Sequence, residues 1–375
     1  MRPIQMVDLQ QQYARIKLQV DSAISEVLET AAFINGKPVT EFSQSLSAYL
    51  NIPNVIPCAN GTDALQIALM GLGLKPGDEV ITPSFTFIAT TEVVALLGLK
   101  PVFAEVDPKT FCLDPTSVEK QITKKTKAIV PVHLYGQSAP MKEIMDLAHK
   151  YNLHVIEDNA QAIGSDYLSP EGKTQKTGTI GTVGTTSFFP SKNLGAYGDG
   201  GALFTHDESL ADRFRMIANH GQKKRYYHEL VGCNSRLDSI QAAILNIKLP
   251  LLDEYILRRR AAADAYDRAF ANHPKITAPF RAPYSKHVFH QYTILLEGAD
   301  RNMLNAYLAS KKIPSMIYYP VPAHRQQMFA AFHSDRQKLD VTDWLTESVI
   351  SLPMHTELEE EQLHFICNSV LEFLN

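Results

Sequence analysis

The feature that most constrains the fold is an alternation of short apolar runs with helical patterns between about residues 54 and 205. Four runs rich in β-branched residues predict strands, at residues 79–83, 101–106, 128–132 and 154–158. Apolar residues at helical spacing predict helices between them, over residues 62–73, 90–98 and 141–152. Strands that alternate with helices pair in parallel, because each crossover returns the chain to the same end of the sheet. We therefore expect an α/β fold with a mostly parallel sheet covered by helices on both faces.

The flanking segments have a different pattern. Apolar residues at helical spacing predict a helix over residues 9–33, before the alternating region. After about residue 245 the pattern predicts three helices and two strands, over residues 250–271, 291–296, near 302–311, near 315–319 and over 358–374. A chain of 375 residues exceeds what one hydrophobic core usually supports. We therefore predict a large α/β domain with an N-terminal arm in residues 1–245, and a small C-terminal α+β domain in residues 246–375.

Composition argues against several classes of protein. The formal net charge is −4, which gives no support for binding to nucleic acid or to an anionic membrane. The four cysteines are widely scattered, and no paired Cys or His spacing indicates a disulfide framework or a metal site. The first residues lack the apolar core of a signal peptide, and no apolar run reaches membrane-spanning length. We expect a cytoplasmic protein that holds no metal.

A lysine in a loop rich in glycine and hydroxyl residues is the strongest indication of chemistry. Lys192 lies between Ser191 and a run of glycines that begins at Gly195, one short segment after Asp158. Asp158 ends a predicted strand, and open α/β sheets bind ligands at the carboxyl ends of their strands. Pyridoxal phosphate (PLP) chemistry needs such a pair, because the amine bonds to the cofactor aldehyde and the acid keeps the pyridinium protonated. Taken alone, Asp158 is equally consistent with a cap for the next helix.

Two further features fit the same cofactor. Residues 59–65 place a turn with Gly61 and Thr62 at the start of a predicted helix, where free N–H groups favour a phosphate. Phe87 directly follows a predicted strand and is placed to stack on a pyridine ring. Alone, the turn is more simply an ordinary helix cap and Phe87 a core residue. Together with the acid and the lysine, they occur in the order needed to surround one PLP. His133 is interpreted as a hydrogen-bonded structural residue.

With these motifs, the chain resembles nearly end to end the PLP-dependent sugar aminotransferases of fold type I named after DegT, DnrJ, EryC and StrS. The resemblance is carried by motifs at residues 60–65, 86–90, 157–162, 187–194 and 234–238. It implies a fold type I PLP transferase and the activity of a PLP-dependent transaminase. Some members of this family are dehydratases with histidine at the lysine position, so the presence of Lys192 favours amino transfer.

The resemblance also implies roles for individual residues. Lys192 is implied to form the Schiff base with PLP and to shuttle the proton, and Asp158 to meet the ring nitrogen. Five more residues are implied to contact the cofactor, at its hydroxyl, ring or phosphate: Gln161, Phe87, Gly61, Thr62 and Ser187.

A second group of residues is implied to belong to a site shared between subunits or to the substrate. Asn234 is implied to reach the phosphate from a neighbouring subunit, which implies a homodimer with shared active sites. Arg236 is implied to point into the same shared site, and its planar guanidinium suits a substrate carboxylate or a sugar phosphate. Tyr318 and Tyr319 match the substrate-lining segment of the family.

Residues 58–67, 187–192, 197–201 and 220–222 are most similar to family members that aminate UDP-2-acetamido-2-deoxy-3-oxo-D-glucuronate. This implies transfer from L-glutamate to a nucleotide-linked ketosugar, for bacterial surface polysaccharides such as lipopolysaccharide and its O-antigen. The runner-up acceptor is a dTDP- or UDP-linked 3-keto- or 4-keto-6-deoxyhexose. Two other classes stay open: a PLP enzyme of another reaction type, such as a dehydratase or lyase, and a non-catalytic regulatory protein on the same fold.

Overall fold

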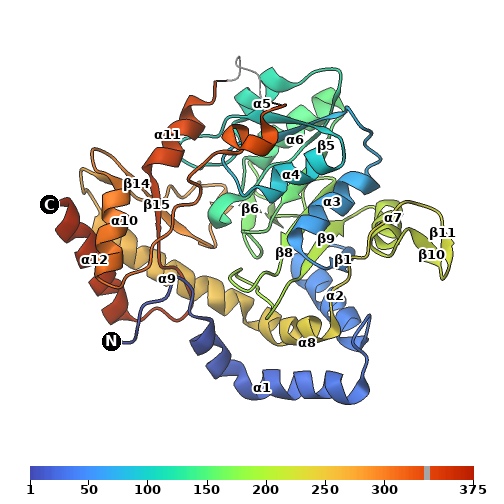
Figure 1. Cartoon of the computed structure of the whole chain (residues 1–375), viewed down its shortest axis with the longest axis horizontal. Coiled ribbons are helices and arrows are strands. Elements are labelled where there is room, and N and C mark those ends of the chain that lie inside the picture. Colours follow the sequence, from blue (N-terminus) through green and yellow to red (C-terminus); the bar gives the residue numbers. More distant parts are fainter. Residues whose placement is uncertain (333–337) are drawn as a thin grey trace.

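The structure is a computed structural model that describes residues 1–332 and 338–375. Its centre is a seven-stranded sheet with the order β1-β9-β8-β5-β4-β2-β3 (Figure 1). The strands are β1 (Asn54–Cys58), β2 (Glu79–Pro83), β3 (Lys100–Ala104), β4 (Thr126–Ile129), β5 (His154–Asp158), β8 (Val183–Ser187) and β9 (Gly201–Thr205). β9 runs antiparallel to both of its neighbours, and the remaining pairings are parallel. The prediction of a mostly parallel α/β sheet is confirmed.

Helices cover both faces of this sheet because successive strand residues point to opposite sides. Val80 packs with Leu65 and Phe214 in one core cluster. The next residue, Ile81, packs with Met141 in another. The first face is covered by α3 (Gly61–Gly71), α4 (Ala89–Leu96) and α7 (Glu208–Ala218), and the second by α5 (Pro115–Gln121), α6 (Met141–Tyr151), α2 (Lys37–Leu50) and α8 (Ser239–Lys248).

The C-terminal part of the chain has its own core. A three-stranded antiparallel sheet packs with Tyr266 and Ile366 in a separate hydrophobic cluster. Its elements are α9 (Leu252–Phe270), β12 (Ile276–Thr277), β14 (Tyr292–Leu296), α10 (Arg301–Ser310), α11 (Asp340–Ser348), β15 (Val349–Leu352) and α12 (Glu360–Leu374). Ile4 belongs to the same cluster, so the first residues lie against this part rather than against the central sheet (Figure 1). The division at residue 245 stays a prediction.

One predicted strand is wrong. Residues near 315–319 form no strand, and Met316 makes an isolated bridge to Ser351 instead. Pro314 and Pro320 bound this segment, and a proline offers no N–H to a strand ladder. The remaining elements are α1 (Leu9–Thr30), β6 (Asp166–Leu168), β7 (Thr174–Lys176), β10 (Gln222–Lys224), β11 (Tyr227–His228), β13 (Ser285–Lys286), η1 (Leu134–Gly136), η2 (Leu249–Leu251), η3 (Ala323–Arg325) and η4 (Gln327–Phe329).

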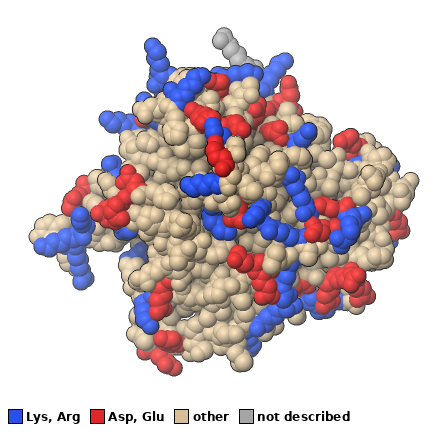
Figure 2. All heavy atoms as spheres, turned by 180° about the vertical axis from the view of Figure 1, so that it is seen from behind, with Lys and Arg blue, Asp and Glu red and all other residues tan. Residues whose placement is uncertain are grey.

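The surface carries charges of both signs. Figure 2 shows basic and acidic side chains interspersed over the rear face, with Lys and Arg gathered on the projecting hairpin β10–β11 at the left. Within residues 1–332 and 338–375, no helix is both long and apolar enough to cross a bilayer. The same residues contain no group of three or more His, Cys, Asp or Glu placed to hold a metal ion.

Candidate active site

A cavity of about 580 Å³ lies where β2, β5 and β8 end and α3 begins. Such a position follows from the sheet, because the carboxyl ends of parallel strands meet at one edge. Nine of the eleven predicted site residues line it: Gly61, Thr62, Phe87, Asp158, Gln161, Ser187, Lys192, Tyr318 and Tyr319. A hollow of the same volume between α9 and α12 contains none of them.

Asp158 is the last residue of β5 and is held as a hydrogen-bond acceptor. Its Oδ2 accepts from Thr90 Oγ1 at 2.8 Å, and its Oδ1 accepts from the Ala160 N–H at 3.1 Å. The side chain is only 5 % exposed. A carboxylate that accepts on both oxygens keeps a fixed direction, and this one faces the cavity. Thr90, on α4, was missed by sequence reasoning because its contact joins segments 68 residues apart.

Lys192 lies in a tight turn after β8. Its N–H donates to the Phe189 carbonyl at 2.8 Å. A Cβ at Gly195 would lie 2.3 Å from the Pro190 carbonyl oxygen, so the turn closes only with glycine there. The fully buried Lys248 donates from Nζ to the Gly195 carbonyl at 2.5 Å. The loop that carries Lys192 is therefore anchored from its own backbone and from α8.

The Lys192 amine is tuned toward its neutral form. Burial lowers its pKa to about 8, against the opposing attraction of Asp158, from an ordinary value of 10.5. A neutral amine is the form that attacks an aldehyde or removes a proton. An amine with this pKa is about one tenth neutral at pH 7 and about nine tenths neutral at pH 9.

We therefore expect the cofactor-free protein to capture PLP faster as the pH rises. The rate should increase about fivefold from pH 7 to pH 8 and less than about twofold from pH 8 to pH 9, because the neutral fraction of Lys192 saturates. Stopped-flow absorbance of the cofactor measures this rate. A profile that keeps rising to pH 10 would show that Lys192 has the ordinary lysine pKa.

The turn into α3 forms a cradle for an anion. Asn60 Oδ1 accepts from the Asp63 N–H at 2.8 Å and so begins the helix at Gly61. The first N–H groups of a helix have no acceptor within it, and they favour a phosphate. A Cβ at Gly61 would lie 2.7 Å from Ser187 Cβ, so glycine lets the helix approach the end of β8. Thr62 and Ser187 add hydroxyl groups to the same wall.

Gln161 connects the cavity to two tyrosines. Its Oε1 accepts from the Tyr135 N–H at 2.8 Å, and its Nε2 donates to Tyr319 Oη at 2.9 Å. The Tyr135 hydroxyl in turn donates to the Tyr318 carbonyl. Phe87 is 55 % exposed, and its ring centroid lies 6.2 Å from that of Tyr319. Phe87 is thus a wall of the cavity, and the reading of it as a core residue is wrong.

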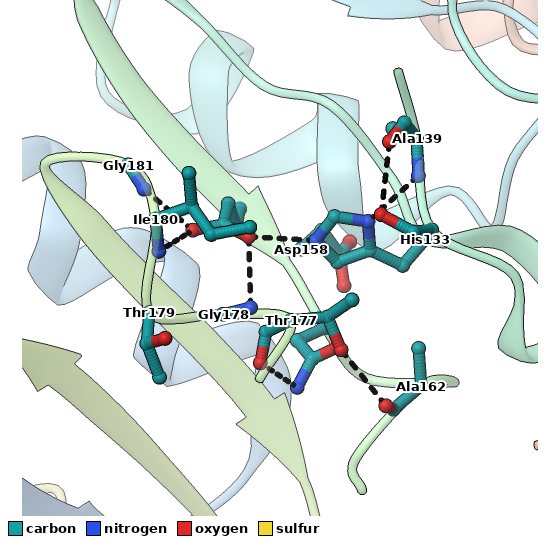
Figure 3. Close-up of polar contacts among 12 residues, drawn as sticks. His133, Ala139, Asp158, Ala162, Thr177, Gly178, Thr179, Ile180 and Gly181 are labelled. Carbon is teal, nitrogen blue, oxygen red and sulfur yellow. Dashed lines mark hydrogen bonds and ion pairs between the residues drawn. The ribbon is translucent and has the colours of Figure 1, made fainter. Parts of the chain in front are cut away.

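A buried hydrogen-bonded network around the Glu157 carboxylate lies next to Asp158 in the sequence, and it includes His133 (Figure 3). Glu157, fully buried, accepts from His133 Nε2 at 2.8 Å and from the N–H groups of Gly178, Ile180 and Gly181. His133 Nδ1 accepts from the Ala139 N–H at 3.0 Å, so Nε2 carries the proton that is donated to Glu157. The prediction that His133 is a hydrogen-bonded structural residue is confirmed.

Eleven further residues of the cavity wall were not predicted as site residues, and His290 and Gln291 are the two of them that come from the predicted C-terminal domain. They lie just before β14, far along the chain from every motif, and no spacing rule pointed to them. The only signal for them in the sequence was a pair of polar residues directly before a buried strand. Conversely, Asn234 and Arg236 do not line this cavity: Asn234 is exposed and Arg236 partly exposed on the segment before α8.

The residues present fit PLP by their chemistry. The α3 cradle offers N–H and hydroxyl donors for a phosphate, Lys192 an amine of lowered pKa, and Asp158 a buried carboxylate. All three face one cavity, and an aromatic ring stands beside them. Phosphate, aldehyde and ring nitrogen are the three functional groups of PLP that these residues can bind.

Comparisons with known proteins agree with this geometry. The family model for the DegT/DnrJ/EryC1/StrS aminotransferase family matches residues 15–371. The chain is 46 % identical over 364 residues to a Pseudomonas aeruginosa protein named UDP-2-acetamido-2-deoxy-3-oxo-D-glucuronate aminotransferase, covering 97 % of this chain and 98 % of the relative. It is 45 % identical over 372 residues to a Geobacillus stearothermophilus protein named pleiotropic regulatory protein, covering 99 % and 98 %. Among solved structures, Streptomyces venezuelae DesV in complex with a ketimine intermediate matches with a TM-score of 0.94 and 38 % identity, over 100 % and 99 % of the two chains.

Proposed function

Because the chain belongs to the DegT/DnrJ/EryC1/StrS aminotransferase family, we propose that it transfers the amino group of L-glutamate to a nucleotide-linked ketosugar, UDP-2-acetamido-2-deoxy-3-oxo-D-glucuronate. The chain is a PLP-dependent aminotransferase. The observation that carries the sugar is the 46 % identity, over 97 % of the chain, to a relative named for that substrate. A product of this kind suits a surface polysaccharide such as lipopolysaccharide.

Each of the site residues has a different role in amino transfer. When bound, PLP supplies an electron sink for the charge that develops at the substrate carbon. Asp158 would meet the ring nitrogen and keep it protonated, because its buried carboxylate favours a cation beside it. The α3 cradle binds the phosphate and fixes the position of the cofactor. Phe87 would stack on the ring, and Gln161 keeps its amide in the wall between Tyr135 and Tyr319.

Lys192 moves the proton. With PLP and substrate bound, its free Nζ would remove a proton from the substrate carbon and return it on the other side of the transferred nitrogen. The pKa of about 8 leaves a useful fraction of Nζ in the neutral form at physiological pH. The same residue runs both halves of the reaction, first with the amino donor and then with the sugar acceptor. The presence of Lys192, on an anchored loop and with a lowered pKa, also argues against a purely regulatory role.

We also propose a homodimer with shared sites. Asn234 and Arg236 stand outside the cavity of their own chain, so the roles implied for them require the cavity of a second copy. Large apolar side chains are exposed near them or on α1, as an interface requires: Leu18, Phe33, Ile34 and Val231. The four unpaired cysteines suit a reducing compartment, and we propose the cytoplasm. Sedimentation of the holoenzyme tests the dimer.

A substrate panel tests the proposed activity. With glutamate and PLP, we expect turnover of UDP-2-acetamido-2-deoxy-3-oxo-D-glucuronate at a kcat/KM at least about tenfold above that of dTDP- or UDP-linked 3-keto- and 4-keto-6-deoxyhexoses, since one recognised charged group is worth at least a factor of this size. Chromatography of the amino sugar product measures it. Turnover of the 6-deoxy sugars alone would reject the uronate, and with it a carboxylate partner for Arg236. No spectral change with any amino donor would favour a lyase or dehydratase.

A further inference from the structure

Residues 286–291 form a strap across one side of the active-site cavity. The Val288 N–H donates to the Gly136 carbonyl at 2.9 Å, and the Gln291 N–H donates to the Tyr135 carbonyl at 3.3 Å. On its other side, Asn193 Nδ2 donates to the Val288 carbonyl at 3.1 Å. The strap is therefore bonded both to the residue after Lys192 and to the residue that orients Gln161.

A buried arginine fixes the strap at His290. Arg259 of α9 is 2 % exposed, and its Nη1 donates to the carbonyls of Phe289 and His290 at 3.2 and 3.3 Å and to that of Met354 at 3.0 Å. Phe289 takes a left-handed backbone conformation with φ 46°, which turns the chain at this point. With the His290 backbone held on both sides of that turn, its ring has a defined direction in the cavity wall.

The two nitrogens of the His290 ring differ in access. Nδ1 is sealed from solvent and has no hydrogen-bond partner among the described residues. A buried N–H without an acceptor is rarer than a buried acceptor without a donor, so Nδ1 is the unprotonated nitrogen. The proton then lies on Nε2, which is not among the sealed, unpartnered atoms, and His290 is one of the residues that line the cavity.

The charge of the ring is also defined. Burial, the Lys192 amine and the Arg259 guanidinium all lower the pKa of His290 well below its usual 6.5. A neutral N–H donor suits an uncharged oxygen, such as the hydroxyl or carbonyl of a sugar. The carboxylates of an amino-acid donor call for a cation instead.

We propose that His290 is a specificity-determining residue that donates a hydrogen bond from Nε2 to an uncharged oxygen of the acceptor sugar, next to the carbon that reacts at Lys192. This role rests on the proposed function, because it requires a ketosugar acceptor. It predicts that His290 acts in the sugar half of the reaction and not in the glutamate half.

Three variants test the role. In His290→Gln the side-chain amide N–H reaches the place of Nε2, whereas in His290→Asn it reaches only that of Nδ1. His287→Asn is the matched control: His287 lies in the same strap, does not line the cavity, and accepts from the Phe289 N–H through Nδ1, which an asparagine oxygen replaces. The two half-reactions are measured separately with the holoenzyme, from the change in cofactor absorbance with glutamate alone and then with the ketosugar.

We expect His290→Asn to lower kcat/KM for the sugar about tenfold and to leave that for glutamate within about twofold, because one hydrogen bond to the sugar is lost. His290→Gln should recover most of the loss, and His287→Asn should behave as wild type. Equal losses in both halves, or the same loss in His287→Asn, would overturn the proposal. Turnover of no ketosugar by the wild type would overturn the proposed function as well.

Binding supplies a readout that does not depend on turnover. With cofactor-free protein, calorimetry compares UDP with UDP-2-acetamido-2-deoxy-D-glucuronate, which has a hydroxyl where the substrate has its keto group. We expect His290→Asn to raise the Kd of the UDP-sugar about tenfold and to leave that of UDP unchanged, since the lost contact is to the sugar. An equal rise for both would place His290 at the nucleotide and refute the contact to the sugar.

Discussion

Lys192→Ala is expected to lower kcat for amino transfer by at least about a thousandfold, because the substitution removes both the covalent link to the cofactor and the group that moves the proton. Nothing else in the described cavity wall replaces it: Lys192 is the only amine among the residues that line the cavity. Product formation from glutamate and the ketosugar measures the loss. Folding should be unaffected, because Lys192 makes no hydrogen bond through its side chain to the described residues and its burial as a cation is itself unfavourable.

Two controls make this result specific. Lys173→Ala removes an exposed lysine from the turn between β6 and β7, which does not line the cavity, and should retain full activity. Lys192→Arg keeps a cation but not a titrating amine, so it should be as inactive as the alanine variant. If the proposed homodimer shares its sites, co-expression of Lys192→Ala with Asn234→Ala should restore activity, since one of the two sites then has both residues intact. Substantial transfer by Lys192→Ala alone would contradict the assignment of the proton-moving group.

The parts of the site that could be predicted from the sequence are those set by the sheet. Asp158 ends an apolar run, and parallel strands bring their carboxyl ends together whatever the rest of the chain does. Gly61 and Thr62 open a helix whose polar start is visible locally. The order of these segments and Lys192 along the chain was then enough to place them around one cavity.

The parts that could not be predicted depend on contacts between distant segments. Thr90 bonds Asp158 across 68 residues, and His290 enters the wall from beyond α9. The strand predicted near residues 315–319 failed for the same kind of reason: its apolar residues are explained by packing of Tyr318 and Tyr319 against the large sheet, not by pairing in a ladder. Hydrophobic periodicity indicates which residues are buried, but it does not reveal which distant segments of the chain contact one another.

Glu157 shows how a buried charge can look like an ordinary strand residue in the sequence. It lies in β5 between Ile156, which ends the apolar run, and Asp158. Its side chain is fully buried, so its charge requires partners. Three backbone N–H groups and one imidazole supply them, all from segments outside β5 (Figure 3).

We expect Glu157→Gln to lower the free energy of unfolding by about 3 kcal/mol, a typical loss when one side of a buried charged network is removed. The carboxylate only accepts hydrogen bonds, whereas an amide must turn its NH2 toward either the Gly178 N–H and His133 or the N–H groups of Ile180 and Gly181. Two donors would then face each other without an acceptor. Urea unfolding of the variant and the wild type measures the difference, with the exposed Glu171→Gln as the control.

The difference in stability between wild type and Glu157→Gln should become smaller as the pH falls. Burial alone would raise the pKa of Glu157, but hydrogen bonds from His133, Gly181 and Gly178 hold it below the ordinary 4.5. The stabilisation is therefore complete above about pH 4.5, where the unfolded carboxyl is also ionised, and it is lost as the pH falls through the lower value in the folded protein. Wild type and Glu157→Gln should thus differ fully at pH 7 and converge in acid. A difference that grows below pH 4 would mean that Glu157 is protonated in the folded protein and that His133 is not held by its charge.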